Sequence, residues 1–337
     1  MTYSAAIDDA LAQAMSADDC IVFWGEDVQA IHRELFGRFG ERRVWNTPIS
    51  ESAFVAAGVT AAMAGLRPVV EVSLVDFLAV AADPLLNHAA KTRAFSGDRW
   101  NVPMVVRSSC GGGYGDGGQH QQSLWGWFAH IPGLSVIVPS NPADAGGLLL
   151  EAIRSDDPVL YLEHKLLSDR WLDVMGRLGR TTVSFDIPDA GRVGTVPATW
   201  EPIPVGSAAI CRPGSDVTIV SVGVGVHRSL QAAEVLDREG IAAEIIDLRT
   251  VQPIDRETVV TSASHTGYLI VVDEDYEAFG LSGEVSAVVA ESCSVPPGFA
   301  RVCTRETIPF SRSAEALALP SVDRIVAATH QLLGRGS

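Results

Sequence analysis

The sequence predicts an α/β fold of two domains, in which a parallel sheet with helices on both faces is followed by a smaller α/β domain. Short apolar runs alternate with helical patterns in both halves of the chain, as is typical of parallel strands joined by helical crossovers. The chain has 337 residues and is 47% apolar, which is enough for two buried interiors. Residues 168–205 interrupt the alternation with scattered Pro, Gly and Thr. We therefore assign 1–185 to the first domain, 186–205 to a linker and 206–335 to the second domain.

The first domain begins with an amphipathic helix over the N-terminal segment MTYSAAIDDALAQAM. Short apolar runs then predict strands at 20–24, 69–74, 103–107, 134–138 and 159–163. Helical patterns fill the intervals at 50–64, 77–94 and 142–153, and Gly65 with Pro68 ends the first of these helices. A glycine-rich loop at 110–118 follows the third strand.

The second domain repeats the alternation on a smaller scale. Its predicted strands cover 217–222, 241–247, 268–273 and 300–303, and its helices cover 227–239 and 283–292. Ser321 is expected to cap a closing helix that runs to Leu333, with Pro320 just outside it. The Gly223-Val224-Gly225 segment lacks the third glycine of a dinucleotide fingerprint, so it is interpreted as a tight turn.

Composition excludes several classes of protein. The net charge of −16 repels phosphate backbones, so nucleic acid is not an expected partner. The acidity serves solubility, or docking onto a basic partner domain. The apolar runs are short and interrupted, and the N-terminus has no signal sequence, so no membrane span is expected. Only 20% of the residues are charged, and this indicates apolar surface that a partner covers.

The five cysteines are odd in number and no pair has metal-ligand spacing. We interpret them as reduced thiols of a cytoplasmic protein. Cys110 lies in the glycine-rich loop and is the thiol to test for reactivity.

Two stretches are candidates for a functional site. In the first, Pro48 stiffens the chain, Ser50 is a natural helix N-cap and Glu51 falls in the first helical turn. Taken alone, Glu51 complements the helix dipole. In the same way Leu74, Val75 and Phe77, at the end of a predicted strand, are core residues unless a flat heterocycle packs against them.

The second stretch is the glycine-rich loop and His120 after it. Residues 111–118 contain six glycines, which permit unusual backbone angles and close approach to a ligand. His120 is either a ligand-facing side chain or a structural one. Gly115-Asp116-Gly117, with Asn141 further along the chain, resembles a Mg²⁺-diphosphate signature, but Asp116 lies deep in the loop instead of at a strand end. His164 is treated as structural.

The motifs together resemble a known family. In order they are GEDV (25–28), TPISE (47–51), RPVVEV (67–72), NHAAK (87–91), VPMVVR (102–107), QHQQS (119–123), HIPGLSVIVPS (130–140), AIRSDDPVLYLEHKLL (152–167) and PSVDRIV (320–326). The pattern is similar to the beta subunits of the thiamine-diphosphate-dependent component of pyruvate, acetoin and branched-chain 2-oxoacid dehydrogenase complexes. The resemblance spans residues 3–333 and implies a transketolase-like pyrimidine-binding domain followed by a transketolase C-terminal domain.

The resemblance also implies roles. Glu51 matches the glutamate that hydrogen-bonds N1′ of thiamine diphosphate and promotes its reactive imino tautomer. Leu74, Val75 and Phe77 match the residues beside the aminopyrimidine, and His120 matches a histidine that orients substrate and assists acyl transfer to lipoamide. An alpha subunit would hold the diphosphate and Mg²⁺ in a heterotetramer of two alpha and two beta subunits. That assembly serves a lipoyl acyltransferase core.

Many family members also bind a structural K⁺ through carbonyl groups. The corresponding positions here are Met104, Ala152, Ile153, Ser155 and Asp157.

The sequence departs from the family at the substrate end of the site. Gln121 replaces the serine of the usual His-Ser-Gln-Ser, and the preceding loop is richer in glycine. The segments HIPGL and LEHKLL favour a pyruvate or acetoin type of substrate. Two alternatives stay open at this point: a self-sufficient transketolase-type enzyme that uses Asp116 and Asn141, and a non-catalytic assembly subunit.

Overall fold

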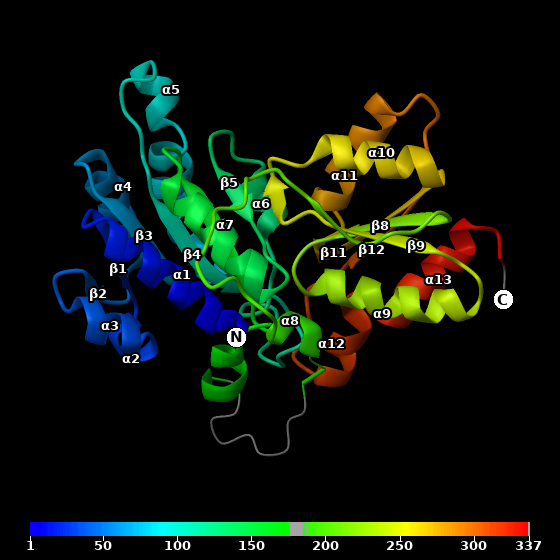
Figure 1. Ribbon diagram of the computed structural model, residues 1–337, viewed down its shortest axis with the longest axis horizontal. Helices are drawn as coiled ribbons and strands as arrows, with labels where there is room; N and C mark the ends of the chain where they lie inside the picture. Colours follow the sequence, from blue (N-terminus) through cyan, green and yellow to red (C-terminus); the bar gives the residue numbers. More distant parts are fainter. Residues whose placement is uncertain (176–184, 187, 336–337) are drawn as a thin grey trace.

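The computed structural model describes residues 1–175, 185–186 and 188–335. They form two sheets that lie side by side (Figure 1). The first sheet has the strand order β10-β5-β6-β4-β3-β1-β2, and the second has the order β12-β11-β8-β9-β7. The α/β expectation is therefore confirmed. In the described parts of the chain, no helix is both long and apolar enough to cross a bilayer.

Six strands of the first sheet run parallel: β1 (Ile21–Gly25), β2 (Val44–Asn46), β3 (Arg67–Leu74), β4 (Val105–Cys110), β5 (Ser135–Ile137) and β6 (Val159–His164). The seventh, β10 (Thr250–Gln252), pairs antiparallel with β5. Since β10 lies in the predicted second domain, the second half of the chain completes the first sheet. Three residues are too short a segment for a sequence pattern to identify.

Helical segments cover both faces of this sheet. They are α1 (Tyr3–Ala17), α2 (Val28–Ile31), α3 (Arg33–Phe39), α4 (Glu51–Met63), η1 (Val75–Ala79), η2 (Pro84–Ala89), α5 (Thr92–Ser96), α6 (Trp125–Ala129), α7 (Pro142–Arg154), η3 (Arg170–Met175) and α8 (Asp189–Arg192). Alternate strand residues face opposite cores: Val69 and Val105 pack with α1 and α7, whereas Val70 and Val106 pack with α4.

The second sheet consists of β7 (Ala209–Arg212), β8 (Val217–Ser221), β9 (Ala243–Asp247), β11 (Tyr268–Tyr276) and β12 (Gly298–Thr304). Its helices are α9 (Val224–Arg238), α10 (Arg256–Thr266), α11 (Leu281–Ser292), α12 (Arg312–Ala318) and α13 (Val322–Leu332). Helices α9 and α13 cover one face, and α10 and α11 the other (Figure 1). Ser321 caps α13 by accepting a hydrogen bond from the Arg324 amide, as predicted.

The apolar interior is continuous across the two sheets. One cluster contains Val106 and Leu160 of the first sheet together with Val220 and Val271 of the second. The two halves are therefore packed through a shared core. The composition had indicated only that the chain has enough apolar residues for two interiors. A rigid contact of this kind fixes the position of second-domain side chains relative to the strand ends of the first sheet.

Two predicted elements differ from the structure. The helix expected at 77–94 is divided into η1, η2 and α5, and Pro84, which has no N–H to donate, is the first residue of η2. Strand β4 continues to Cys110, so this residue lies in the sheet and the loop begins at Gly111. Residue 187 of the predicted linker lies outside the described residues. So do residues 176–184, which belong to the predicted interruption at 168–205.

Candidate functional site

Polar side chains gather at the carboxyl ends of the parallel strands in the first sheet. Glu26 follows β1, Thr47 follows β2, Asp76 follows β3, and His120 ends the loop after β4. Each of these four residues has one buried polar atom with no hydrogen-bond partner in the described structure: Glu26 Oε1, Thr47 Oγ1, Asp76 Oδ2 and His120 Nδ1. Buried polar atoms are nearly always paired in a folded protein. This sheet edge is also where open α/β sheets bind ligands, so the unpaired atoms mark a candidate ligand site.

Glu51 is the first residue of α4 and is only 8% exposed. The Thr47 amide donates to the Gly25 carbonyl at 2.9 Å, which ties the approach to the helix to the end of β1. Ser50 is the N-cap residue, as predicted, but its side chain makes no capping hydrogen bond. The carboxyl of Glu51 therefore lies at the positive end of the helix dipole, at the same sheet edge as the unpaired atoms.

Glu26 shares this site with Glu51. The Ser73 hydroxyl donates to Glu26 Oε2 at 3.2 Å. Burial and then the nearby charge of Glu51 raise the pKa of Glu26 above its usual value. The sequence interpretation used GEDV only as part of a family pattern and missed Glu26 as a site residue, although its place directly after a strand was a usable signal.

The side chains of Phe77 and His120 are in contact. Their ring centroids are 5.6 Å apart, and the rings are nearly perpendicular at 87°. The Ser52 hydroxyl donates to the Val80 carbonyl at 2.6 Å, which holds the start of α4 against the end of η1. Glu51 and Phe77 therefore lie on two segments that are fastened to each other.

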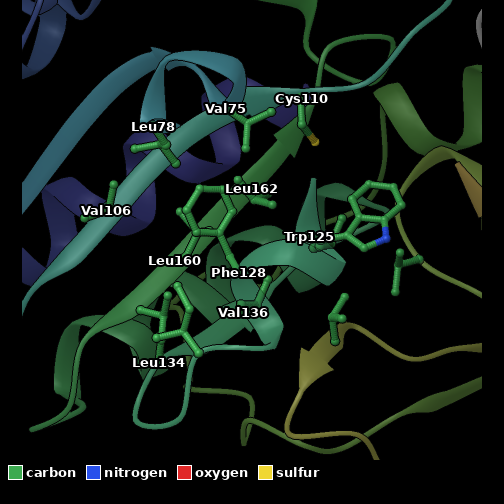
Figure 2. Packing of buried hydrophobic residues seen from close by; sticks show 14 of the residues in the cluster. Val75, Leu78, Val106, Cys110, Trp125, Phe128, Leu134, Val136, Leu160 and Leu162 are labelled. Carbon is green, nitrogen blue, oxygen red and sulfur yellow. The ribbon is translucent and has the colours of Figure 1, made fainter. Parts of the chain in front are cut away.

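Leu74 and Val75 are placed differently from Phe77. Leu74 is 7% exposed and Val75 is fully buried in the apolar core, where Figure 2 shows it among other core side chains. The side chain of Val75 therefore serves packing, and a contact with a bound heterocycle would have to come from its backbone.

The segment around His120 is held by three neighbours. Lys165 Nζ donates to the His120 carbonyl. Gln122 Nε2 donates to Asp76 Oδ1 at 2.7 Å, and the Tyr276 hydroxyl of the second domain donates to Gln122 Oε1 at 3.1 Å. These contacts fix the backbone of His120 but leave its Nδ1 atom free to meet a ligand.

Lys165 is a buried cation that the sequence interpretation passed over. Its ammonium group lies 5.3 Å from the ring centroid of Tyr114 and 5.6 Å from that of Trp171. Burial lowers the pKa of Lys165 to about 8. The sequence signal for this buried cation was a lysine in the apolar segment LEHKLL, directly after a strand.

Comparison with known proteins decides the family. Residues 1–169 match the transketolase pyrimidine binding domain, and residues 206–325 match the transketolase C-terminal domain. The acetoin:2,6-dichlorophenolindophenol oxidoreductase subunit beta of Cupriavidus necator is 38% identical over 98% of this chain and 97% of its own length. The 2-oxoisovalerate dehydrogenase subunit beta of Bacillus subtilis is 36% identical over 98% of each chain. This chain belongs to the family of 2-oxoacid dehydrogenase E1 beta subunits.

One further relative and one solved structure are also similar to this chain. The mitochondrial pyruvate dehydrogenase E1 component subunit beta-2 of Oryza sativa is 37% identical over 97% of this chain and 85% of its own length. A split-gene transketolase, solved as an inactive beta4 tetramer, superposes with a TM-score of 0.79. The superposition covers 99% of this chain and 99% of the transketolase chain at 21% sequence identity, which supports the fold alone.

Asn141, which resembled part of a diphosphate signature, makes a structural contact in this E1 beta chain. The side chain of Asn141 caps α7 by accepting from the Asp144 amide at 3.0 Å. Within the described residues, no group of three His, Cys, Asp or Glu side chains is arranged to hold a metal ion. His164 is fully buried and donates from Nε2 to Glu274 at 2.9 Å, while its Nδ1 accepts from the Leu166 amide. His164 is thus structural.

Four of the five carbonyl groups of the expected potassium site accept hydrogen bonds in this structure. Arg67 Nη1 donates to the carbonyls of Ile153 and Ser155 at 3.0 and 2.9 Å. The other engaged carbonyls are those of Met104, which accepts from the Val159 amide, and Asp157, which accepts from the Ser155 hydroxyl. A guanidinium among these carbonyls repels a second cation. In this structure the Ile153 and Ser155 carbonyls thus face a guanidinium, and the K⁺ site at these positions stays a prediction.

The thiols are expected to react in the order of their exposure. Cys110 is fully buried, and burial raises the pKa of its thiol well above the usual value, so it is not the reactive thiol that the sequence indicated. Burial likewise raises the pKa of Cys303 to about 12. Cys20 is exposed.

Brief alkylation with iodoacetamide, followed by peptide mass spectrometry, should label Cys20 and leave Cys110 unmodified until urea is added. Early labelling of Cys110 would contradict its placement in β4.

Proposed function

We propose that this chain is the beta subunit of a thiamine-diphosphate-dependent 2-oxoacid dehydrogenase, which decarboxylates a 2-oxoacid and transfers the acyl group to lipoamide together with an alpha subunit. The observation that carries the proposal is the set of buried, unpaired polar atoms around Glu51, Phe77 and His120 at the strand ends. The full-length similarity to E1 beta subunits supports it.

The side chains present fit the aminopyrimidine end of the cofactor. A pyrimidine edge carries ring nitrogens and an amino group, which match carboxyl partners such as Glu51 and Glu26, and its flat face matches the half-buried ring of Phe77. When bound, thiamine diphosphate supplies the carbon nucleophile for the oxo group of the substrate. Glu51 holds and returns a proton at N1′.

Glu26 supports this proton relay. Because burial and the charge of Glu51 raise the pKa of Glu26, Glu26 keeps its proton to higher pH than an ordinary glutamate. A protonated Glu26 removes charge repulsion against Glu51 and offers a donor for the site. His120 extends toward the substrate end, where its unpaired Nδ1 can bind the oxo group or the incoming sulfur of lipoamide.

A partner chain is needed to close the site. Ile49 and Val80, which flank the start of α4, are 82% and 58% exposed. An apolar groove of about 550 Å³, lined by residues such as Met63, Phe95 and Trp100, continues along the same helix. Apolar surface of this kind indicates a protein interface. We assign it to an alpha subunit that holds the diphosphate and Mg²⁺, in a heterotetramer of two alpha and two beta subunits that serves a lipoyl acyltransferase core.

The substrate is proposed to be of the pyruvate or acetoin type, from the segments HIPGL and LEHKLL. The five cysteines form no disulfide, which fits the reducing cytoplasm.

The proposal is tested by reconstitution. The purified chain is assayed for 2-oxoacid decarboxylation alone and with its alpha subunit, with thiamine diphosphate and Mg²⁺ in both assays. We expect activity from the pair and none from the lone chain. Full activity from the lone chain would exclude the subunit assignment, and loss of Mg²⁺-dependent cofactor binding in Asp116→Ala would favour a self-sufficient enzyme.

A further inference from the structure

The glycine-rich loop before His120 is built around the side chain of Gln121. Gln121 is fully buried, and its Oε1 accepts from the amides of Tyr114 and Gly115 at 2.8 and 2.9 Å. Its Nε2 lies 3.4 Å from the Gly117 carbonyl, to which it donates. One side chain therefore satisfies three backbone groups of the loop that it directly follows.

The second domain holds the same loop from the other side. Glu315 of α12 is 1% exposed, and its Oε1 accepts from the Gly113 amide at 2.8 Å. Glu274 of β11 accepts from the Gly112 amide at 2.7 Å. Carboxylates accept stronger hydrogen bonds from amides than neutral groups do, so these two contacts bind the loop firmly to the shared core.

This arrangement needs glycine where the loop passes its neighbours. Gly111 has a φ of +98°, and a Cβ there would lie 2.1 Å from His164 Nε2. Gly113 has a φ of +86°, and a Cβ would lie 2.8 Å from Leu166. The high glycine content thus lets the loop turn its amides inward onto side-chain oxygens.

We propose that Gln121 and Glu315 clamp this loop and thereby set the position of His120, so that both are positioning residues for the acyl-transfer end of the site. The two departures from the family pattern, the extra glycines and the glutamine in place of serine, then form a single structural unit. A serine hydroxyl is two carbon atoms closer to the backbone than the Gln121 carboxamide and cannot reach both loop amides. The inference rests on the proposed function only for the role of His120.

The test uses the reconstituted alpha–beta complex with four single variants, and repeats one of them in a His120→Asn background. Gln121→Ser and Glu315→Ala remove the clamp, Glu315→Gln retains an acceptor oxygen, and Glu306→Ala is a matched control at an exposed glutamate on the segment before α12. Hydrogen exchange of peptides from 111–120 reports the loop directly. Acyl transfer to an isolated lipoyl domain, and reduction of the dye 2,6-dichlorophenolindophenol, report the reaction with and without the lipoyl acceptor.

In Gln121→Ser and Glu315→Ala we expect loop exchange about tenfold faster, as follows from the loss of its hydrogen bonds. Transfer to the lipoyl domain should fall by about 10- to 100-fold through misplacement of His120, with a smaller loss in dye reduction. Glu315→Gln should restore most of both readouts, and Glu306→Ala should match the parent. In a His120→Asn background, Gln121→Ser should cause no further loss of transfer, because it acts through His120.

Two results would overturn the clamp. One is loop exchange in Gln121→Ser as slow as in the parent. The other is an equal, additive loss of transfer from Gln121→Ser with and without His120. If the parent complex has no activity at all, the proposed function fails, and the exchange measurement still decides whether Gln121 and Glu315 hold the loop.

Discussion

Replacing Glu51 by glutamine is expected to lower 2-oxoacid turnover of the alpha–beta complex by about 100- to 10,000-fold, the usual contribution of a general acid–base group. Glutamine keeps the size and a hydrogen-bonding oxygen of the side chain but cannot exchange a proton with the aminopyrimidine. At the start of α4, Glu51 is only 8% exposed, so bulk solvent reaches little of its side chain. Steady-state decarboxylation measured at saturating thiamine diphosphate gives the result.

Folding should be nearly unaffected by the same substitution, because a charge at a helix start contributes only about 0.3–1 kcal/mol. Glu34→Gln is a matched control, since Glu34 is also in the first turn of a helix but is exposed on α3. We expect Glu34→Gln to retain parental turnover. If Glu51→Gln stayed within about threefold of the parent, the acid–base role would be wrong and an assembly role would gain support.

Replacing Arg107 by leucine is expected to destabilise the chain by about 3–5 kcal/mol, the cost of leaving buried charges without their partner. The Arg107 side chain is 2% exposed and forms ion pairs with Glu163, with Asp8 at 3.3 Å and with Glu71 at 3.4 Å. Without it, the buried Glu163 loses its ion-pair partner, whereas Asp8 keeps His32 at 2.9 Å and Arg170 at 2.6 Å, and Glu71 keeps His32 at 3.0 Å. Urea unfolding of the purified chain, followed by far-UV circular dichroism, measures the change in its first transition.

Two further variants separate this network from a general effect of removing arginine. Arg256 is half-exposed and pairs with Glu284 and Glu291 at 3.5 and 3.7 Å, so Arg256→Leu should change stability by less than about 1 kcal/mol. The double variant Arg107→Leu/Glu163→Leu should recover part of the loss, since removing both charges is far less costly than removing one. A single Arg107→Leu variant as stable as the Arg256→Leu control would contradict the buried network.

The sequence predicted the parts of the fold that depend on local patterns. Apolar runs located the strands β1, β3 and β6 to within a few residues, because burial on both faces of a parallel strand favours an apolar segment. It did not predict β10, whose three residues are a strand only because β5 presents an open edge to them. The sequence pattern also predicted one helix at 77–94, whereas the structure has separate segments there, and Pro84 is the first residue of one of them, η2.

The sequence likewise predicted some residues of the candidate site and missed others. Glu51, Phe77 and His120 were identified by family resemblance, and the structure brings Phe77 and His120 into contact. The functional roles of these residues stay predictions. Glu315 and Glu274 were not identified, because they lie 202 and 162 residues along the chain from the loop amides that they accept. Contacts of such range follow from how the two domains pack, which no local pattern records.

The central claim is that the Glu51 carboxyl moves a proton at N1′ of the bound cofactor. It is tested most directly by the rate at which the C2 proton of thiamine diphosphate exchanges with deuterium in the alpha–beta complex, measured by acid quench and proton NMR. We expect exchange at least about 100-fold slower in Glu51→Gln than in the parent and in Glu34→Gln. Equal exchange rates in all three proteins would contradict it.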